Sequence, residues 1–273
     1  MSQQSVAEHV RVCWPEEIGC LVVGHGTVNE TGASEAREVA LRMQEVLARV
    51  PVELGFLECV EPTISQGVER LASRGCSMII AAPLLLFSAG HAMRDVPEEL
   101  ARASKVSGIE VFQAEVLGCH PQLVALSQRR RHEAIRLLLP CEDSESIDLF
   151  VGRGSSDPEA LDHLLEFAAL SARGTDLSLA QSQTSQTRTH IGFVAVAKPS
   201  LQEAIQNAAS EIPRRVVVRP HLLFAGKVEM EIQTAVASAQ KTYPRTEWVL
   251  AKRLGCDHSV VLSLLDRATA VIP

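Results

Sequence analysis

An internal repeat constrains the fold of this chain more than any other feature of its sequence. The chain has 273 residues, and from Leu149 onward its segments follow those of the first half in the same order. Four pairs of segments match: LVVGHGTVNETG with LFVGRGSSDPEA, GFLECVEPTISQGV with GFVAVAKPSLQEAI, APLLLFSAGHAMRD with RPHLLFAGKVEMEI, and LGCHPQLVAL with LGCDHSVVLSL. We therefore predict a duplicated domain. The boundary falls near residues 142–146, which gives domains of residues 1–142 and 143–273.

Each half alternates short apolar runs with segments of helical periodicity. In the first half we expect strands that end at Val23 and cover residues 52–58, 76–87 and 110–117, each followed by a helix. Thr63 and Gln66 have the spacing of a capping box, which marks a helix start, and Ser200 with Glu203 repeats it. Aromatic residues make up only 4% of the chain, which suits closely packed layers. The fold class is α/β, with two tandem doubly wound domains and parallel sheets.

Charge and cysteine content exclude several classes of protein. A net charge of −7 offers no basic field for nucleic acid, and the run 129–136, RRRHEAIR, is interpreted as a solvated helix face. No secretory or membrane-spanning segment is present, so we expect neither a membrane partner nor export, and we place the protein in the cytoplasm. The seven cysteines form no CxxC pair and are interpreted as reduced, buried thiols. The polar segment 174–189 is predicted to be a mobile surface loop.

Three residues of the first half lie where strands are expected to end. His25 follows the first strand, Glu58 closes the second, and His91 follows the third. In open parallel sheets, ligands bind beyond the carboxyl ends of the strands, so two imidazoles and a carboxylate should converge on one crevice. Neutral imidazoles suit Co, Ni, Fe and Zn, and a carboxylate can accept protons or add a ligand. The flanking glycines free the backbone to turn the rings into that crevice.

Other interpretations of these residues stay open. The GHG triplet is also compatible with a tight turn that holds an incidental histidine, and the same applies to His91. The segment GHGTVN lacks the third glycine of a dinucleotide-binding fingerprint, and the chain has no P-loop. The second half carries Arg153, Ala195 and either Lys227 or Val228 at the matching positions. A duplicate that keeps the scaffold and loses only these three residues indicates one working metal site.

The motifs resemble those of a known family, the class II chelatases of the sirohydrochlorin cobaltochelatase and ferrochelatase type. VVGHGT, GFLECVEPTI, PLLLFSAGHAMRDVP and LGCHPQL match its successive motifs across the first half. VGRGSSDP and RPHLLFAG resemble the degenerate second domain of its longer members. The cysteine cluster and histidine-rich tail of some longer members are missing, so we infer no cluster and no metal storage.

The resemblance implies that the chain inserts Co²⁺ or Fe²⁺ into sirohydrochlorin, a tetrapyrrole of the cobalamin and sirohaem pathways. The metal-binding and catalytic residues would be His25, His91 and Glu58, with Glu61 as the reserve carboxylate. The only metal needed is the substrate ion, and no further cofactor is expected. Single-domain relatives need two copies to form a cleft, so a duplicated chain would form the cleft between its own domains and work as a monomer.

Cations are needed around the crevice because sirohydrochlorin carries acetate and propionate arms. The expected substrate-binding residues are Arg94, Arg153, His221 and Lys227. His120 is interpreted as a helix-start residue. Two rival functions remain: a metal or tetrapyrrole carrier without turnover, and a phosphate-handling enzyme that uses the glycine turn, although the clustered cations of phosphoryl chemistry are missing.

Overall fold

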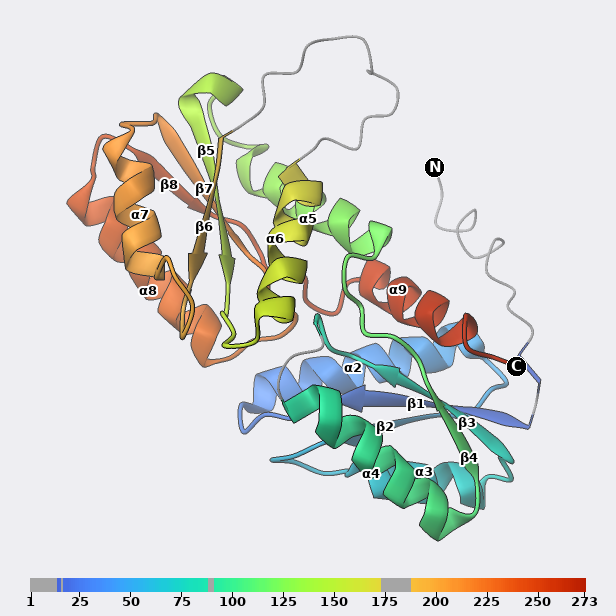
Figure 1. Ribbon diagram of the computed structural model, residues 1–273. Coiled ribbons are helices and arrows are strands. Elements are labelled where there is room, and N and C mark those ends of the chain that lie inside the picture. The colour runs from blue at the N-terminus through green and yellow to red at the C-terminus, as the bar shows by residue number, and fades with distance from the viewer. Residues whose placement is uncertain (1–13, 16, 88–90, 173–187) are drawn as a thin grey trace.

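The protein consists of two parallel sheets, one from each half of the chain (Figure 1). The computed structural model describes residues 14–15, 17–87, 91–172 and 188–273, without the side chains of 91–93. The first half gives β1 (Ile18–Gly24), α2 (Glu30–Leu47), β2 (Val52–Phe56), α3 (Ile64–Ser73), β3 (Met78–Pro83), α4 (His91–Ser107), β4 (Glu110–Gln113) and α5 (Pro121–Ile135). The strands lie in the order β2-β1-β3-β4. The first strand therefore lies between the second and the third, so their carboxyl ends are neighbours at one edge of the sheet.

The second half repeats this arrangement. A 3₁₀ turn (Asp143–Glu145) leads into β5 (Ser146–Gly152), α6 (Pro158–Ala172), β6 (Arg188–Phe193), α7 (Leu201–Ser210), β7 (Arg215–Pro220), α8 (Lys227–Thr242), β8 (Glu247–Leu250) and α9 (His258–Thr269). Its strand order, β6-β5-β7-β8, is that of the first sheet. The α/β class with two duplicated parallel sheets is therefore confirmed.

Local sequence signals explain where several elements begin. Thr63 caps α3 and Ser200 caps α7, and both predicted capping boxes form in full. His120 is the N-cap of α5, as expected, and its Nδ1 accepts from the Gln122 N–H at 3.3 Å. Every residue of β1 and of β5 is buried, because helices cover both faces of each sheet.

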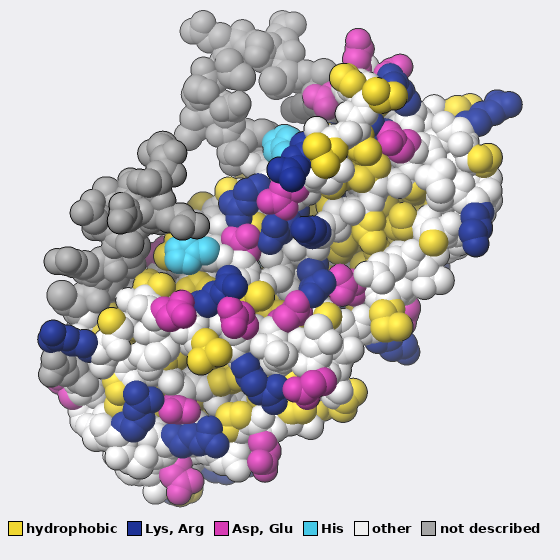
Figure 2. All heavy atoms as spheres, turned by 180° about the vertical axis from the view of Figure 1, so that it is seen from behind, with side chains coloured by type: hydrophobic (Ala, Val, Ile, Leu, Met, Phe, Trp, Pro, Cys, Tyr) yellow, Lys and Arg dark blue, Asp and Glu magenta, His cyan; other side chains and the backbone are white. Residues whose placement is uncertain are grey.

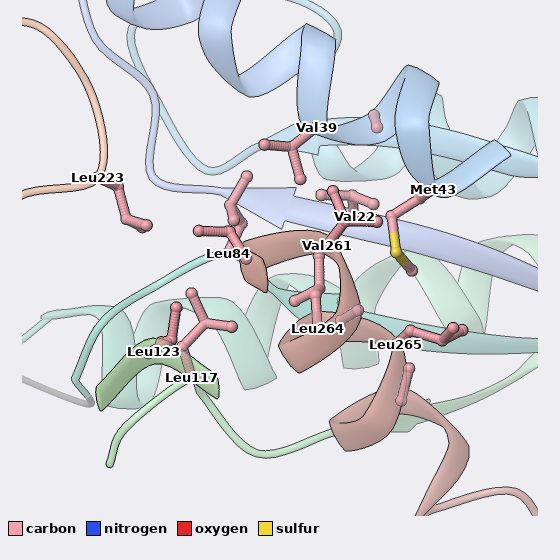
Figure 3. Close-up of a cluster of buried hydrophobic side chains, with 14 of the residues drawn as sticks. Val22, Val39, Met43, Leu84, Leu117, Leu123, Leu223, Val261, Leu264 and Leu265 are labelled. Carbon is pink, nitrogen blue, oxygen red and sulfur yellow. The ribbon is translucent and has the colours of Figure 1, made fainter. Parts of the chain in front are cut away.

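The last helix of each half packs on the other half. Helix α9 lies against β3 and α2 of the first sheet, whereas α5 lies against β7 and α6 of the second. Figure 3 shows the contact that α9 makes: Val261, Leu264 and Leu265 of α9 meet Val22 of β1 and Met43 of α2. One apolar core is therefore shared by both halves. The division of the chain at residue 142 stays a prediction. Each sheet is covered in part by a helix that comes from the other side of this division.

The face of the first sheet that α9 covers is apolar. The face of the second sheet that α5 covers carries buried charged side chains. Asp148 of β5 and Arg219 of β7 are each 2% exposed, and the Arg219 Nη1 donates to Asp148 Oδ2 at 3.0 Å. Arg131 of α5 donates to the same carboxylate at 2.7 Å, and Ser127 Oγ accepts from the Arg219 Nη2 at 2.8 Å. Burial lowers the pKa of Arg219, and the Asp148 carboxylate opposes that shift.

This network corrects the interpretation of the basic run as a solvated helix face. Arg131 is buried against the second sheet, with 13% of its side chain exposed. Arg130 donates to the Leu254 carbonyl oxygen at 3.2 Å and pairs with Asp257 at 3.0 Å. Arg129, by contrast, has 45% of its side chain exposed, and His132 and Arg136 of the same run are also exposed. The run therefore attaches α5 to the second half, a role that local periodicity does not reveal.

Several other expectations concern the thiols, the polar loop and the membrane. The six cysteines of the described part are free, and burial raises the pKa of Cys20 to about 12, as expected for a packing thiol. Cys59, however, is exposed. Most of the predicted loop, residues 174–187, lies outside the described residues, and its last two positions belong to β6. No helix in the described ranges has the length and hydropathy needed to span a membrane.

Candidate metal and tetrapyrrole site

The candidate site lies at the carboxyl end of β1. The imidazole Nδ1 of His25 is 3.4 Å from the Glu58 Oε1, and 41% and 58% of the two side chains are exposed. Both groups are therefore open to a solute. Strand β2 ends at Phe56, earlier than expected, so Glu58 lies in the following loop. Its position is nevertheless fixed, because the Glu58 N–H donates to the His25 carbonyl oxygen at 3.0 Å.

The glycine after His25 is required by this close approach of two loops. Gly26 has φ +98°, and a Cβ there would lie 1.9 Å from the Glu58 carbonyl oxygen. A side chain would therefore push the His25 loop away from the Glu58 loop, besides adding strain at positive φ. The GHG triplet is thus a packing requirement that also brings an imidazole next to a carboxylate.

The second half builds the same turn without these side chains. The Ala195 N–H donates to the Arg153 carbonyl oxygen at 2.8 Å, and Gly154 has φ +90°. A Cβ on Gly154 would lie 2.0 Å from the Ala195 carbonyl oxygen. Arg153 therefore stands where the first half has His25, and Ala195 stands where it has Glu58. The backbone is preserved and the imidazole and carboxylate are not.

The third predicted ligand begins a helix. His91 is the first residue of α4, and Lys227 is the first residue of α8, so the structure pairs His91 with Lys227 and not with Val228. The side chain of His91 lies outside the described residues, so the convergence of all three groups stays a prediction. Within the described part, no group of three His, Cys, Asp or Glu side chains is placed to hold a metal ion.

The reserve carboxylate and three of the predicted cations are accessible. Glu61 is exposed and lies beyond the end of β2, so strand alternation does not determine where it points. Arg94 is exposed near the start of α4, and Arg153 is exposed after β5. Lys227 has 90% of its side chain exposed, with Nζ 3.8 Å from the Glu231 carboxylate. These three cations can reach a solute, whereas their contact with a tetrapyrrole stays a prediction.

The expectation for His221 is wrong. It is 3% exposed and packs against the rings of Phe150 and Phe167, at centroid distances of 5.3 and 4.1 Å. Burial, followed by the nearby charge of Arg219, lowers the pKa of His221 to about 3. The ring is therefore neutral and hidden, so it cannot present a cation to carboxylate arms. Its place in the repeat is that of Leu84, an apolar core residue.

A contact between the halves lies close to the candidate site and has only a weak signal in the local sequence. The Glu35 carboxylate on α2 accepts from the Ala225 N–H at 2.8 Å and pairs with Arg253. Gly32, one turn before Glu35, allows this approach, because a Cβ there would lie 2.5 Å from the Ala225 carbonyl oxygen. The loop after β7 is therefore held against the helix that follows His25. The signal is that Glu35 lies early in α2, soon after the N-cap Asn29. It therefore lies near the carboxyl end of β1, where the helix begins.

The charged side chains around the join of the halves do not form a field of one sign. Figure 2 shows basic and acidic side chains interspersed over the visible face. Arg253, for example, pairs with both Glu35 and Glu229. On the described part of this face, no broad basic patch is seen that would suit a polyanion.

Comparisons with known proteins show the family and the fold to which the chain is similar. The model of the CbiX family matches residues 19–134 and 148–271, one segment in each half. The sirohydrochlorin ferrochelatase of Priestia megaterium is 32% identical over 237 residues, which cover 86% of this chain and 83% of that protein. The sirohydrochlorin cobaltochelatase of the same organism is 25% identical over 250 residues, covering 91% and 78%. The structure of SirB from Bacillus subtilis with Fe³⁺ has a TM-score of 0.77 at 26% identity, covering 93% of this chain and 96% of that one.

Proposed function

Because the chain belongs to the CbiX family, we propose that it is a sirohydrochlorin chelatase, an enzyme of the lyase class that inserts a divalent metal into sirohydrochlorin. Relatives named sirohydrochlorin ferrochelatase and sirohydrochlorin cobaltochelatase match more than three quarters of their own length. The proposal rests on one observation in particular. The turn that brings the imidazole of His25 next to the carboxylate of Glu58 is built twice, and only the first copy carries groups able to bind a metal and take up protons.

The chemistry requires two operations. A divalent ion must exchange solvent ligands for ring nitrogens, and two pyrrole N–H protons must leave, so that one M²⁺ enters for two H⁺ released. We assign metal binding to His25 and His91, with Glu58 beside them. When the His25 Nδ1 carries its proton toward the Glu58 carboxylate, the opposite ring nitrogen keeps its lone pair for a metal.

Glu58 is also the proposed base for the pyrrole protons. Its exposed carboxylate can take a proton from the macrocycle and pass it to water, which a fully buried group could not do. Glu61 remains the alternative base. No nucleotide or redox group is needed for this exchange, so we propose that the substrate ion is the only metal and that no further cofactor takes part.

The second half is proposed to form the opposite wall of the substrate cleft. The loop after β7 already lies against α2 through Ala225 and Glu35, which brings Lys227 toward the first half. Arg153 and Lys227, together with Arg94 of the first half, are exposed and can pair with carboxylate arms of the tetrapyrrole. His221 is no longer part of this set. Action as a monomer and a place in the cytoplasm stay predictions.

The metal is left open by the ligand set. Imidazole ligands bind divalent ions in an order that places Co²⁺ above Fe²⁺, and Ni²⁺ and Cu²⁺ above both, so donor type alone does not select the ion. The similar proteins are named for iron and for cobalt. Whether the product feeds cobalamin or sirohaem synthesis therefore depends on metal supply as well as on the protein.

A turnover assay tests the proposed function. Sirohydrochlorin in large excess over protein, with Co²⁺ or Fe²⁺, should be converted over many turnovers, as followed by its absorption spectrum. A carrier would stop after one equivalent of substrate per chain, and this result would contradict the enzyme. An equimolar mixture of Co²⁺ and Fe²⁺ then shows which metal is preferred.

The base is tested by Glu58→Gln, with Glu61→Gln as its matched control. Glu58→Gln should still bind sirohydrochlorin but should lower kcat about 10- to 100-fold and change its pH profile, because the proton acceptor is lost. Glu61→Gln should leave kcat within about twofold, the scatter expected of an uninvolved surface carboxylate. The reverse result would move the role of base to Glu61.

A further inference from the structure

The start of α8 is tied to α2 by two contacts that lie on either side of Lys227. On one side, the Ala225 N–H donates to the Glu35 carboxylate at 2.8 Å. On the other side, Glu229, in the first turn of α8, accepts from the Arg253 Nη1 at 2.6 Å. Arg253 also pairs with Glu35 through its Nη2, so both contacts end in one ion-paired group. The backbone of Lys227 is therefore held on both sides.

This ion-paired group of Glu35, Arg253 and Glu229, here called the clamp, is largely shielded from solvent. The three side chains are 19%, 21% and 17% exposed. Burial opposes the charged form of Arg253, but the two carboxylates together outweigh it and raise the pKa of the guanidinium. Ion pairs that are partly buried are screened less by salt than exposed pairs are. The clamp is therefore a firm connection between the halves.

The clamp connects Lys227 to the helix that follows His25. Helix α2 has Asn29 as its N-cap, shortly after His25, and Glu35 lies in its second turn. A hydrogen-bonded helix keeps the spacing of its residues. The contact between Glu35 and the start of α8 therefore sets how far Lys227 lies from the His25 turn.

The clamp is present in one copy of the repeat. His163 stands where the first half has Glu35, and Val116 stands where the second half has Arg253. Neither a carboxylate nor a guanidinium is repeated at these two positions. Because the two sheets still have the same strand order, this ion pairing is not part of the shared scaffold. It distinguishes the copy of the loop that leads to Lys227.

We propose that Glu35 and Arg253 are positioning residues for Lys227, which they hold where its ammonium group can pair with a carboxylate arm of the tetrapyrrole. This inference rests on the proposed function of the chain. The Lys227 side chain is 90% exposed, so the position of its backbone decides which part of a solute it can reach. Loss of the clamp should weaken binding of the tetrapyrrole and leave binding of the metal ion unchanged.

A double-variant cycle tests the proposal through the Kd of the full chain for sirohydrochlorin, measured from its absorption spectrum without metal. Lys227→Ala and Glu35→Ala should each raise this Kd about two- to fivefold, the range for an exposed charge pair. The double variant should bind no more weakly than Lys227→Ala alone, because Glu35 acts through Lys227. Arg253→Met should behave as Glu35→Ala does. Two effects that multiply in the double variant would overturn the proposal.

Glu38→Ala is the matched control, because Glu38 also lies on α2 but pairs with Arg42 of its own helix at 2.7 Å. Its Kd for sirohydrochlorin should stay within twofold of that of the wild type. In steady-state kinetics, Glu35→Ala should raise the KM for sirohydrochlorin and keep kcat. Should Glu35→Ala not fold, Glu35→Gln gives the same cycle, since it removes the charge and keeps an acceptor for the Ala225 N–H.

Co²⁺ binding, measured by calorimetry without tetrapyrrole, separates positioning from a general loss of structure. The Kd for Co²⁺ should stay within twofold of that of the wild type in Glu35→Ala and in Lys227→Ala, because neither changes His25. An equal rise in the Kd values for Co²⁺ and for sirohydrochlorin in Glu35→Ala would contradict the positioning role. Failure of the proposed function gives a different pattern, in which the cycle behaves as expected but the wild type shows no turnover. A wild type that does not bind sirohydrochlorin would overturn both.

Discussion

The two halves of this protein have nearly the same backbone and different chemistry at the end of their first strands. Gly26 and Gly154 both hold a positive φ, and each lies so close to a facing carbonyl oxygen that no side chain fits. The residues before them, His25 and Arg153, differ completely in what they can bind. The comparison teaches that the glycines serve the fold and are kept in both copies, whereas the side chains serve a function and are kept in one.

The interiors of the two halves also differ, but here the second half carries the charged groups and the first half does not. The buried ionic set of the second sheet, Asp148, Arg219, Ser127 and Arg131, stands where the repeat of the first sheet has Cys20, Ala82, Leu264 and Ala268. Both sheets nevertheless have the same strand order. The fold therefore does not require the ionic network.

The largest expected effect comes from breaking that network at its centre. Asp148→Ala should lower the free energy of unfolding by about 3–5 kcal/mol, because it leaves the guanidinium of buried Arg219 without its carboxylate. Cys20→Ala, at the equivalent position, should cost about 1 kcal/mol or less. Urea unfolding monitored by circular dichroism measures both variants.

A double variant sharpens the same comparison. Asp148→Leu with Arg219→Met replaces the pair by apolar side chains of similar volume, and it should be close to neutral relative to the wild type, as such replacements often are. Equal losses in the single and the double variant would show that the second sheet needs the charges themselves and not merely their pairing.

The next effect concerns the difference at the strand ends. His25→Ala should reduce the rate of metal insertion by more than about 100-fold. Loss of a partner outside the ligand set costs up to about 100-fold, and loss of a ligand itself should cost more. Arg153→His should not create a second site, because Ala195 supplies no carboxylate beside it. Metal stoichiometry by calorimetry should stay at one per chain, and a value of two would contradict the one-site model.

A smaller effect follows from the buried imidazole of the second half. The pKa of His221 is about 3 when folded and near 6.5 when unfolded, so the unfolded state takes up a proton that the folded state refuses. Its contribution to stability is complete above pH 6.5 and is lost as the pH falls toward 3, at no more than about 1.4 kcal/mol per pH unit.

Replacing this imidazole by the side chain of its counterpart should remove that dependence. His221→Leu adopts the residue that the first half has at Leu84, so the free energy of unfolding should fall less between pH 6.5 and pH 5 than in the wild type. Denaturant titrations at the two pH values measure this difference. An equal fall in the free energy of unfolding between the two pH values in the variant and the wild type would assign the acid sensitivity to other groups.

The smallest expected effect is that of Arg153→Ala. An exposed charge pair contributes about 1 kcal/mol or less, so the KM for sirohydrochlorin should rise about two- to fivefold while kcat is kept. Arg245, an exposed arginine before β8 in the same half, supplies the control as Arg245→Ala. Equal KM values in the two variants would remove Arg153 from the wall of the cleft.

Local features were predicted well because their causes are local. Thr63 and Ser200 form their capping boxes within one helical turn, and the apolar runs around Val23 and Val151 become buried central strands. The duplication, the parallel sheets and the approach of His25 to Glu58 also follow from the sequence, since parallel strands with right-handed crossovers leave few arrangements.

Other features were decided by the tertiary structure alone. The sequence by itself determined two copies of one α/β unit, their capped helices, and the glycine turn that places an imidazole beside a carboxylate. It did not show that α5 and α9 are exchanged between the sheets, that Arg131 is buried against Asp148, or that His221 is hidden from any substrate. The physical reason is that burial and ion pairing depend on which surfaces meet across the halves, and residues such as Arg131 and Asp148 meet only when a whole helix has docked on a sheet.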